Sequence, residues 1–82
     1  MNIYVANLPF SVDELQVEQL FRKYGTVEKT TIIKDKETGK SKGFGFVEMP
    51  NEAEANNAIL GLHQFTLEGR KLTCRAANNQ RN

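Results

Sequence analysis

The stretch that decides the fold is Lys42-Gly-Phe-Gly-Phe-Val-Glu-Met49. Alternate side chains of a β-strand share a face, so a strand here points Phe44 and Phe46 to the same side. The opposite side carries small and aliphatic residues, which are Gly43, Gly45, Val47 and Met49. Glycines let a helix side chain approach the sheet closely. We therefore expect the aliphatic side to face a helical layer and the two phenylalanines to stand on a face that no helix covers.

Segments on both sides of this stretch alternate between strand and helix patterns. Residues 2–8 read as a strand that stops at Pro9, which has no N–H for a ladder. Apolar residues at spacings of three and four predict two helices. They are Val17, Leu20, Phe21 and Tyr24 in the first, and Ala55, Ala58, Ile59 and Leu62 in the second. Residues 27–33, with an uneven alternation that favours a bulge, and residues 70–76 read as further strands.

Polar residues mark where the two helices begin. The first helix has two candidate starts, Asp13 with Gln16 and Ser11 with Glu14. Asn51 with Glu54 predicts the start of the second helix, and each pair has the spacing of a capping box. Residues 64–69 read as a loop or a small hairpin, and Pro50 ends the strand before the second helix.

The order of elements is strand, helix, strand, strand, helix, strand. This order predicts an α+β fold of the ferredoxin-like βαββαβ type, with a four-stranded antiparallel sheet and two helices on one face. A chain of 82 residues fits one domain. We expect that domain over residues 1–77, followed by a short polar tail over residues 78–82.

The uncovered face of this sheet predicts a binding surface. Tyr4 points to the same side as the phenylalanines if strands one and three are the adjacent central pair. Tyr4, Phe44 and Phe46 then form one aromatic platform on which bases can stack, at roughly 1–3 kcal/mol each. Lys42, at the edge of the platform, can meet a phosphate. Aromatic residues in strands are more often core residues, but here the core is already filled by Ile3, Val5 and the helix stripes.

Residues 42–49 match the octapeptide signature of the RNA recognition motif family at seven positions, with Met49 in place of an aromatic residue. Ile3-Tyr-Val-Ala-Asn-Leu8 resembles the family's hexapeptide signature. The resemblance covers residues 2–77. It is closest to short single-motif RNA-binding proteins of bacteria and to the motif of plant glycine-rich proteins. Because residue 49 lies on the inward face, we expect this departure to alter packing and not RNA contact.

The resemblance implies roles for individual residues. Tyr4 and Phe44 are expected to stack on bases, and Phe46 to pack against sugars or between nucleotides. Lys42 is expected to contact phosphate. Asn7 matches the asparagine of the hexapeptide, which serves either the end of the strand or the ligand. The partner implied is single-stranded RNA, and the implied role is post-transcriptional regulation or RNA chaperoning.

Other candidates rest on softer patterns. Lys29 and Arg75 are placed by alternation on the open face, where they either hold the RNA backbone or are ordinary solvated residues. Asn78 lies in a tail that in this family often crosses the sheet and bonds to bases. His63 reads as a helix-terminal residue, not a ligand. Cys74 reads as a small buried hydrophobe.

Two alternatives to RNA binding stay open. The fold also serves protein-interaction modules, although the three aromatic residues favour RNA. Single-stranded DNA is the other, because stacking does not distinguish it from RNA. Acylphosphatases of this fold use an arginine in the first loop, and here that loop is Pro9-Phe10-Ser11. No metal cluster or catalytic pair appears in the sequence, so we expect no enzyme, no cofactor and no metal.

Charge and composition add weak expectations. The net charge is +1, but basic residues gather in residues 29–42 and 70–81, so one face can still be basic. No apolar run is long enough to cross a membrane. The single cysteine and the absence of a signal-like start lead us to expect a cytoplasmic protein. We expect a monomer.

Overall fold

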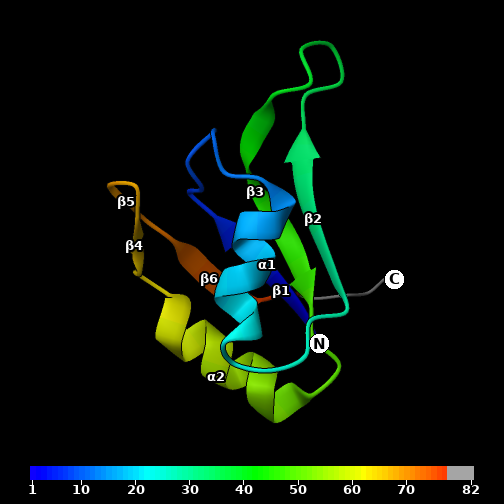
Figure 1. Cartoon of the computed structure of the whole chain (residues 1–82), viewed down its shortest axis with the longest axis vertical. Coiled ribbons are helices and arrows are strands. Elements are labelled where there is room, and N and C mark those ends of the chain that lie inside the picture. Colours follow the sequence, from blue (N-terminus) through cyan, green and yellow to red (C-terminus); the bar gives the residue numbers. More distant parts are fainter. Residues whose placement is uncertain (78–82) are drawn as a thin grey trace.

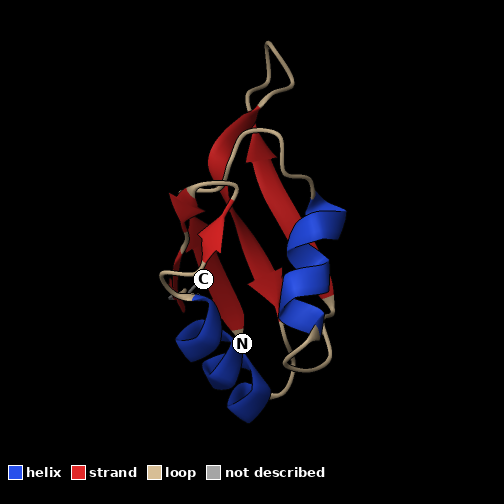
Figure 2. Ribbon diagram, turned by 60° about the vertical axis from the view of Figure 1, so that its left-hand side comes forward, coloured by secondary structure: helices blue, strands red, loops and turns tan. Residues whose placement is uncertain are grey.

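Four strands form the main sheet: β1 (Asn2–Ala6), β2 (Lys29–Lys34), β3 (Ser41–Glu48) and β6 (Thr73–Ala76). Their order across the sheet is β2-β3-β1-β6, and each neighbouring pair is antiparallel. The computed structural model describes residues 1–77. Helices α1 (Glu14–Arg22) and α2 (Glu52–Leu62) both lie over the same face of this sheet (Figures 1 and 2). The predicted ferredoxin-like fold is confirmed.

The core lies between the sheet and the two helices. Helix α1 packs against β2 and α2 packs against β6. The strands contribute Ile3, Val5 and Val47 from their inward faces, all at most 1% exposed. Met49 is fully buried, as expected for a residue on the inward side. Neither helix within residues 1–77 has the length and apolar character needed to span a bilayer.

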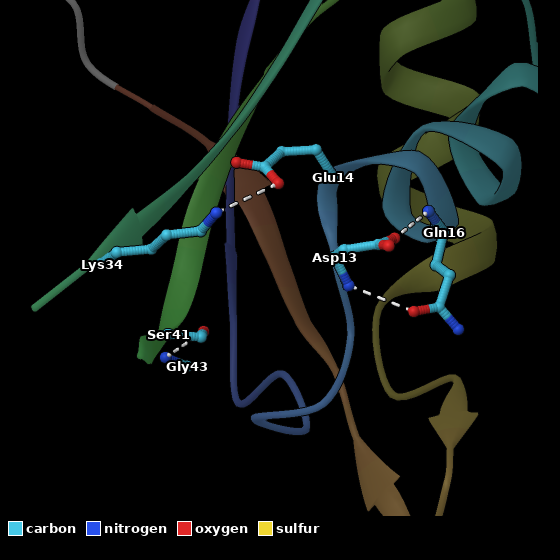
Figure 3. Close-up of polar contacts among 6 residues, drawn as sticks. All are labelled: Asp13, Glu14, Gln16, Lys34, Ser41 and Gly43. Carbon is cyan, nitrogen blue, oxygen red and sulfur yellow. Dashed lines mark hydrogen bonds and ion pairs between the residues drawn. The ribbon is translucent and has the colours of Figure 1, made fainter. Parts of the chain in front are cut away.

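The start of α1 is the predicted capping box. The Gln16 N–H donates to Asp13 Oδ1 at 3.0 Å, and the Asp13 N–H donates to Gln16 Oε1 at 3.1 Å (Figure 3). Two otherwise orphaned N–H groups at the helix start are thereby satisfied. The competing start at Ser11 is not used, because its hydroxyl donates to Glu68 at 2.9 Å. Glu14 instead forms an ion pair with Lys34 of β2, with Nζ and Oε1 3.7 Å apart (Figure 3).

The start of α2 differs from its prediction. Asn51 caps the helix, since its side-chain oxygen accepts the Glu54 N–H at 2.9 Å. The Glu54 carboxylate does not complete a box, because it accepts the Thr26 N–H at 3.1 Å. It therefore joins α2 to the loop after α1, a contact between distant segments that local spacing cannot reveal.

Strand bounds also differ from the predictions. Strand β1 ends at Ala6, because Asn7 has a left-handed backbone with φ of 62°. The predicted strand over residues 70–76 is two strands. Its first part, β5 (Arg70–Lys71), pairs with β4 (Thr66–Leu67) as a hairpin, and only β6 joins the main sheet.

The predicted bulge lies mainly on β3. Ile32 pairs with Gly45 and Lys34 pairs with Ser41, so the one residue between them on β2 faces three on β3, residues 42–44. Gly43 has a φ of +88°, which a residue with a Cβ rarely adopts. Its N–H donates to Ser41 Oγ at 3.0 Å (Figure 3). The bulge changes the direction of the chain near the start of β3.

Candidate nucleic-acid interface

Three aromatic side chains lie together on the face of the sheet opposite the helices. Tyr4 of β1 is directly opposite Phe46 of β3, and Phe44 is two pairs further along, opposite Ala6. The ring centroid of Tyr4 lies 6.0 Å from that of Phe44 and 5.7 Å from that of Phe46. We call Tyr4, Phe44 and Phe46 the aromatic platform. All three are only partly buried, so their rings present surface to a ligand.

The platform is held in place by the core behind it. In the same two strands the alternating neighbours Ile3, Val5 and Val47 are buried under the helices. Gly45 stands between the two phenylalanines, and a Cβ there would press on the backbone of β2, lying 3.0 Å from Ile32 Cα. Strands β2 and β3 therefore meet closely behind the rings. A rigid support of this kind orders the rings before a ligand arrives, which lowers the entropy cost of binding.

Arg75 lies beside the platform on β6. It is directly opposite Tyr4 in the register, and its guanidinium carbon is 4.9 Å from the centroid of the Tyr4 ring. This distance allows a cation–π interaction. Arg75 is exposed and lies on the same face of the sheet as the platform, as alternation predicted.

The two predicted lysines lie near opposite ends of the platform. Lys42 lines a hollow next to Phe44, and Lys29 lines another next to Phe46. Both lysine side chains are exposed. Lys29 is directly opposite Glu48, a carboxylate on the same hollow. Basic groups thus surround the platform, with one acidic group among them.

Asn7 lies at the end of β1, where both ends of its side-chain amide are engaged within the protein. Its Nδ2 donates to the Lys71 carbonyl at 2.8 Å, and its Oδ1 accepts from Arg70 Nη2 at 2.6 Å. The amide joins β5 to the end of β1. Of the two roles that the sequence offered for Asn7, this is the one at the end of the strand. Asn78, the remaining predicted site residue, lies outside the described residues.

Sequence reasoning assigned no role to several residues near the platform. Phe10 is 65% exposed, and the guanidinium carbon of Arg70 lies 5.8 Å from its ring centroid. Glu48 and Asn2 line the hollow next to Phe46. Alternation assigns no face to Phe10, because it follows the strand in a loop. The feature of the sequence that points to Phe10 is its place directly after Pro9, as an aromatic residue outside both helix stripes.

His63 and Cys74 serve the fold. The Cys74 N–H donates to His63 Nδ1 at 3.1 Å, which joins the end of α2 to β6. The Cys74 side chain is buried, and this burial raises the pKa of its thiol from 9.0 to about 11. Within residues 1–77, no three His, Cys, Asp or Glu side chains gather in a way that would hold a metal ion.

Known proteins resemble this chain in both sequence and structure. The 28 kDa chloroplastic ribonucleoprotein of Spinacia oleracea is 45% identical over 95% of this chain, and RNA-binding protein CP31B, chloroplastic, of Arabidopsis thaliana is 46% identical over 95%. The chain spans only 34% and 27% of the lengths of these two curated relatives.

Solved structures give the same result. The crystal structure of RNA binding protein PG1 superposes with a TM-score of 0.94 at 44% identity, covering 100% of this chain and 99% of the other. A Sxl-lethal protein/RNA complex superposes with a TM-score of 0.87 at 37% identity, covering 93% of this chain and 47% of the other. The family model described as RNA recognition motif matches residues 3–73. With its sheet, its platform and these relatives, the chain belongs to the RNA recognition motif family.

Proposed function

We propose that this chain binds single-stranded RNA on the open face of its main sheet. The observation that carries the proposal is the aromatic platform, three adjacent rings on a sheet face that neither helix covers. An apolar, aromatic patch exposed beside basic groups needs a partner, and unpaired bases offer flat rings that stack on it. The names of the relatives, which are ribonucleoproteins and RNA-binding proteins, support the same ligand.

Each platform residue has a role in this proposal. Tyr4 and Phe44 stack on successive bases, and Phe46 packs against a sugar or between nucleotides. The 6.0 Å between the rings of Tyr4 and Phe44 suits neighbouring bases of one strand, because each ring then supports a different base. Stacking tolerates any sequence, since every base has a π-face.

The basic residues around the platform neutralise phosphates. Lys42, Lys29 and Arg75 are exposed at its edges and come from three different strands. A strand of RNA laid over the rings therefore meets positive charge on several sides. Affinity should fall as salt rises, because each neutralised phosphate releases counterions. Asn7 acts indirectly, by holding Arg70 and the β5 backbone.

The proposal is for a binding module whose role follows transcription, as a regulator or a chaperone of RNA, and not for an enzyme. A monomeric state and a cytoplasmic location stay predictions. Both of the curated relatives named above carry the word chloroplastic in their names, and a fluorescent fusion imaged in cells measures the location of this protein.

Fluorescence anisotropy of labelled, unstructured RNA tests the proposal, with the wild-type protein beside Phe44→Ala. The variant should lose on the order of 1–3 kcal/mol of binding free energy if base stacking carries the contact. Phe65→Ala is the matched control, because Phe65 is an aromatic residue 40% exposed outside the platform. Circular dichroism melting checks that both variants fold.

The outcomes separate the alternatives. Equal RNA binding by wild type and Phe44→Ala would mean that the RNA-binding site does not lie on the open face of the sheet. A DNA oligonucleotide of the same sequence that binds as tightly as the RNA would show that the 2′-hydroxyl contributes nothing. No binding of either nucleic acid by the wild-type protein would refute the proposal and turn attention to a protein partner.

A further inference from the structure

A second aromatic surface stands beside the platform, beyond the end of β1. A hollow of about 260 Å³ lies there, with Phe44 on the sheet side and Phe10 on the loop side. Lys42 and Arg70 also line it. The hollow is continuous with the platform, because Tyr4 and Phe44 belong to both. A ligand strand that covers the platform can therefore continue into it.

Phe10 has no role in the core that would explain its position. Its ring is 65% exposed, whereas the core is built from other residues, and Leu8 and Val12 on either side are buried. Gly43 makes room for the ring, since a Cβ on this glycine would lie 3.3 Å from Phe10 Cε1. The loop thus holds an aromatic ring at the surface, against the backbone of β3, where it is available to a partner.

Arg70 is anchored next to this ring. Its Nη2 donates to Asn7 Oδ1 at 2.6 Å, and its guanidinium carbon is 5.8 Å from the centroid of Phe10. An arginine has five N–H donors, so this bond leaves others for a phosphate. Asn7 also donates from its Nδ2 to the Lys71 carbonyl at 2.8 Å, so its amide is held between Lys71 and the guanidinium of Arg70.

Charge distinguishes this hollow from two of the others near the sheet, while a third, lined by Tyr4, Phe46 and Arg75, likewise has no acidic lining residue. Its charged lining residues are Lys42 and Arg70, and none of the described residues that line it is acidic. The hollow next to Phe46 includes Glu48. The larger hollow of about 690 Å³ between the first loop and the β2–β3 loop includes Asp13, and its Lys34 is paired with Glu14. A negatively charged strand is therefore favoured at the Phe10 end.

We propose that RNA bound on the platform continues off the sheet, so that one further nucleotide places its base against Phe10 and its phosphate near Arg70 and Lys42. This inference rests on the proposed RNA binding and extends its footprint by one stacked base. Asn7 is a positioning residue for the added contact. The hollow adds a binding position next to the three rings of the platform and shares Tyr4 and Phe44 with it.

A length series of RNA oligonucleotides of about three to six nucleotides, extended at either end, tests the inference by anisotropy. Wild type should gain roughly 5- to 140-fold in affinity when the added nucleotide reaches Phe10, the range expected for stacking of one base. Phe10→Leu should lose this gain and bind the shorter RNA as wild type does. An abasic nucleotide at the added position should also remove the gain in wild type.

Controls separate this inference from the function on which it rests. Phe44→Ala should weaken binding at every length, while Phe65→Leu should bind like wild type at every length. Arg70→Gln should lower the slope of log affinity against log salt by about 0.7 for the longer RNA only. If Phe10→Leu keeps the full gain while Phe44→Ala loses affinity, the further inference is overturned and the proposed function stands. If wild type binds no RNA of any length, both are overturned.

Discussion

Replacing Gly43 with alanine tests the bulge that shapes the edge of the interface. Gly43 lies on β3 with φ of +88°, next to Phe44 and Lys42, and its carbonyl accepts the Leu8 N–H at 2.8 Å. A Cβ at this position meets two penalties. The backbone conformation is strained for any L-residue with a side chain, and the new methyl group lies 3.3 Å from Phe10 Cε1.

The expected loss of stability follows from these two terms. The positive φ costs roughly 1–2 kcal/mol. The contact with Phe10 adds little, because that ring is 65% exposed and can move by a few tenths of an ångström. A domain of this size is stable by roughly 4–12 kcal/mol, so the variant should remain folded. For so small a domain, the melting temperature should fall by about 4–16 °C.

The assay is thermal and urea unfolding followed by circular dichroism, with Gly69→Ala as the matched control. Gly69 has φ of +84° but nothing within 4 Å of its added Cβ, so it reports the backbone penalty alone. The two variants should lose similar stability. A double-mutant cycle of Gly43→Ala with Phe10→Leu then measures the contribution of the ring.

An unchanged melting temperature for Gly43→Ala, beside a lowered one for Gly69→Ala, would contradict the argument. It would mean that the backbone at residue 43 is not in the left-handed region, or that the bulge shifts freely. A loss of unfolding free energy far above 3 kcal/mol would indicate that the hydrogen bond from the Leu8 N–H to the Gly43 carbonyl is also broken, which would leave the end of β1 unpaired.

Further predictions concern Asp13, Cys74 and Lys42. Asp13→Ala removes the cap of α1 and should lower the free energy of unfolding by about 0.5–2 kcal/mol in a urea titration; no change would mean that the capping box contributes nothing. Cys74 should react with a thiol reagent at neutral pH only after unfolding, because its side chain is 2% exposed and its burial raises the thiol pKa to about 11. Because the pKa is raised in the folded state, the contribution of Cys74 to stability is fully present below pH 9.0 and declines as pH rises toward about 11. Unfolding curves at each pH measure this decline, and Cys74→Ala should abolish it. Lys42→Gln should lower the slope of log RNA affinity against log salt concentration by about 0.7. An unchanged slope would mean that Lys42 does not contact a phosphate.

Local pattern was sufficient for most of the fold and for the platform. Alternation along residues 42–49 separates the two phenylalanines from the buried glycines, and the register of β1 against β3 brings Tyr4 to Phe46. Helical spacing and the Asp13 cap place α1. The pairing of Tyr4 with Phe46 follows from the order of the strands in the expected fold. The other features depend on neighbours within a few residues, where the period of the backbone alone decides which side chains share a face.

Contacts between distant segments required the tertiary structure. Glu54 binds the backbone of Thr26 and not its own helix start, and the strand predicted over residues 70–76 divides because its first part pairs with Thr66–Leu67. The extra residues of the bulge lie on β3, where Gly43 permits the turn. None of these follows from periodicity, because each depends on which of several possible partners lies nearest in the folded chain.

The sequence by itself determined the order of the elements, the face on which the platform stands and the family that these patterns resemble. Only the tertiary structure decided what surrounds that platform. It placed Phe10 of a loop and Arg70 of a hairpin, 60 residues apart in the chain, within one hollow, and it engaged the side chain of Asn7 between them. A loop has no period that assigns its side chains to a face, so the position of such residues follows only from how the chain packs.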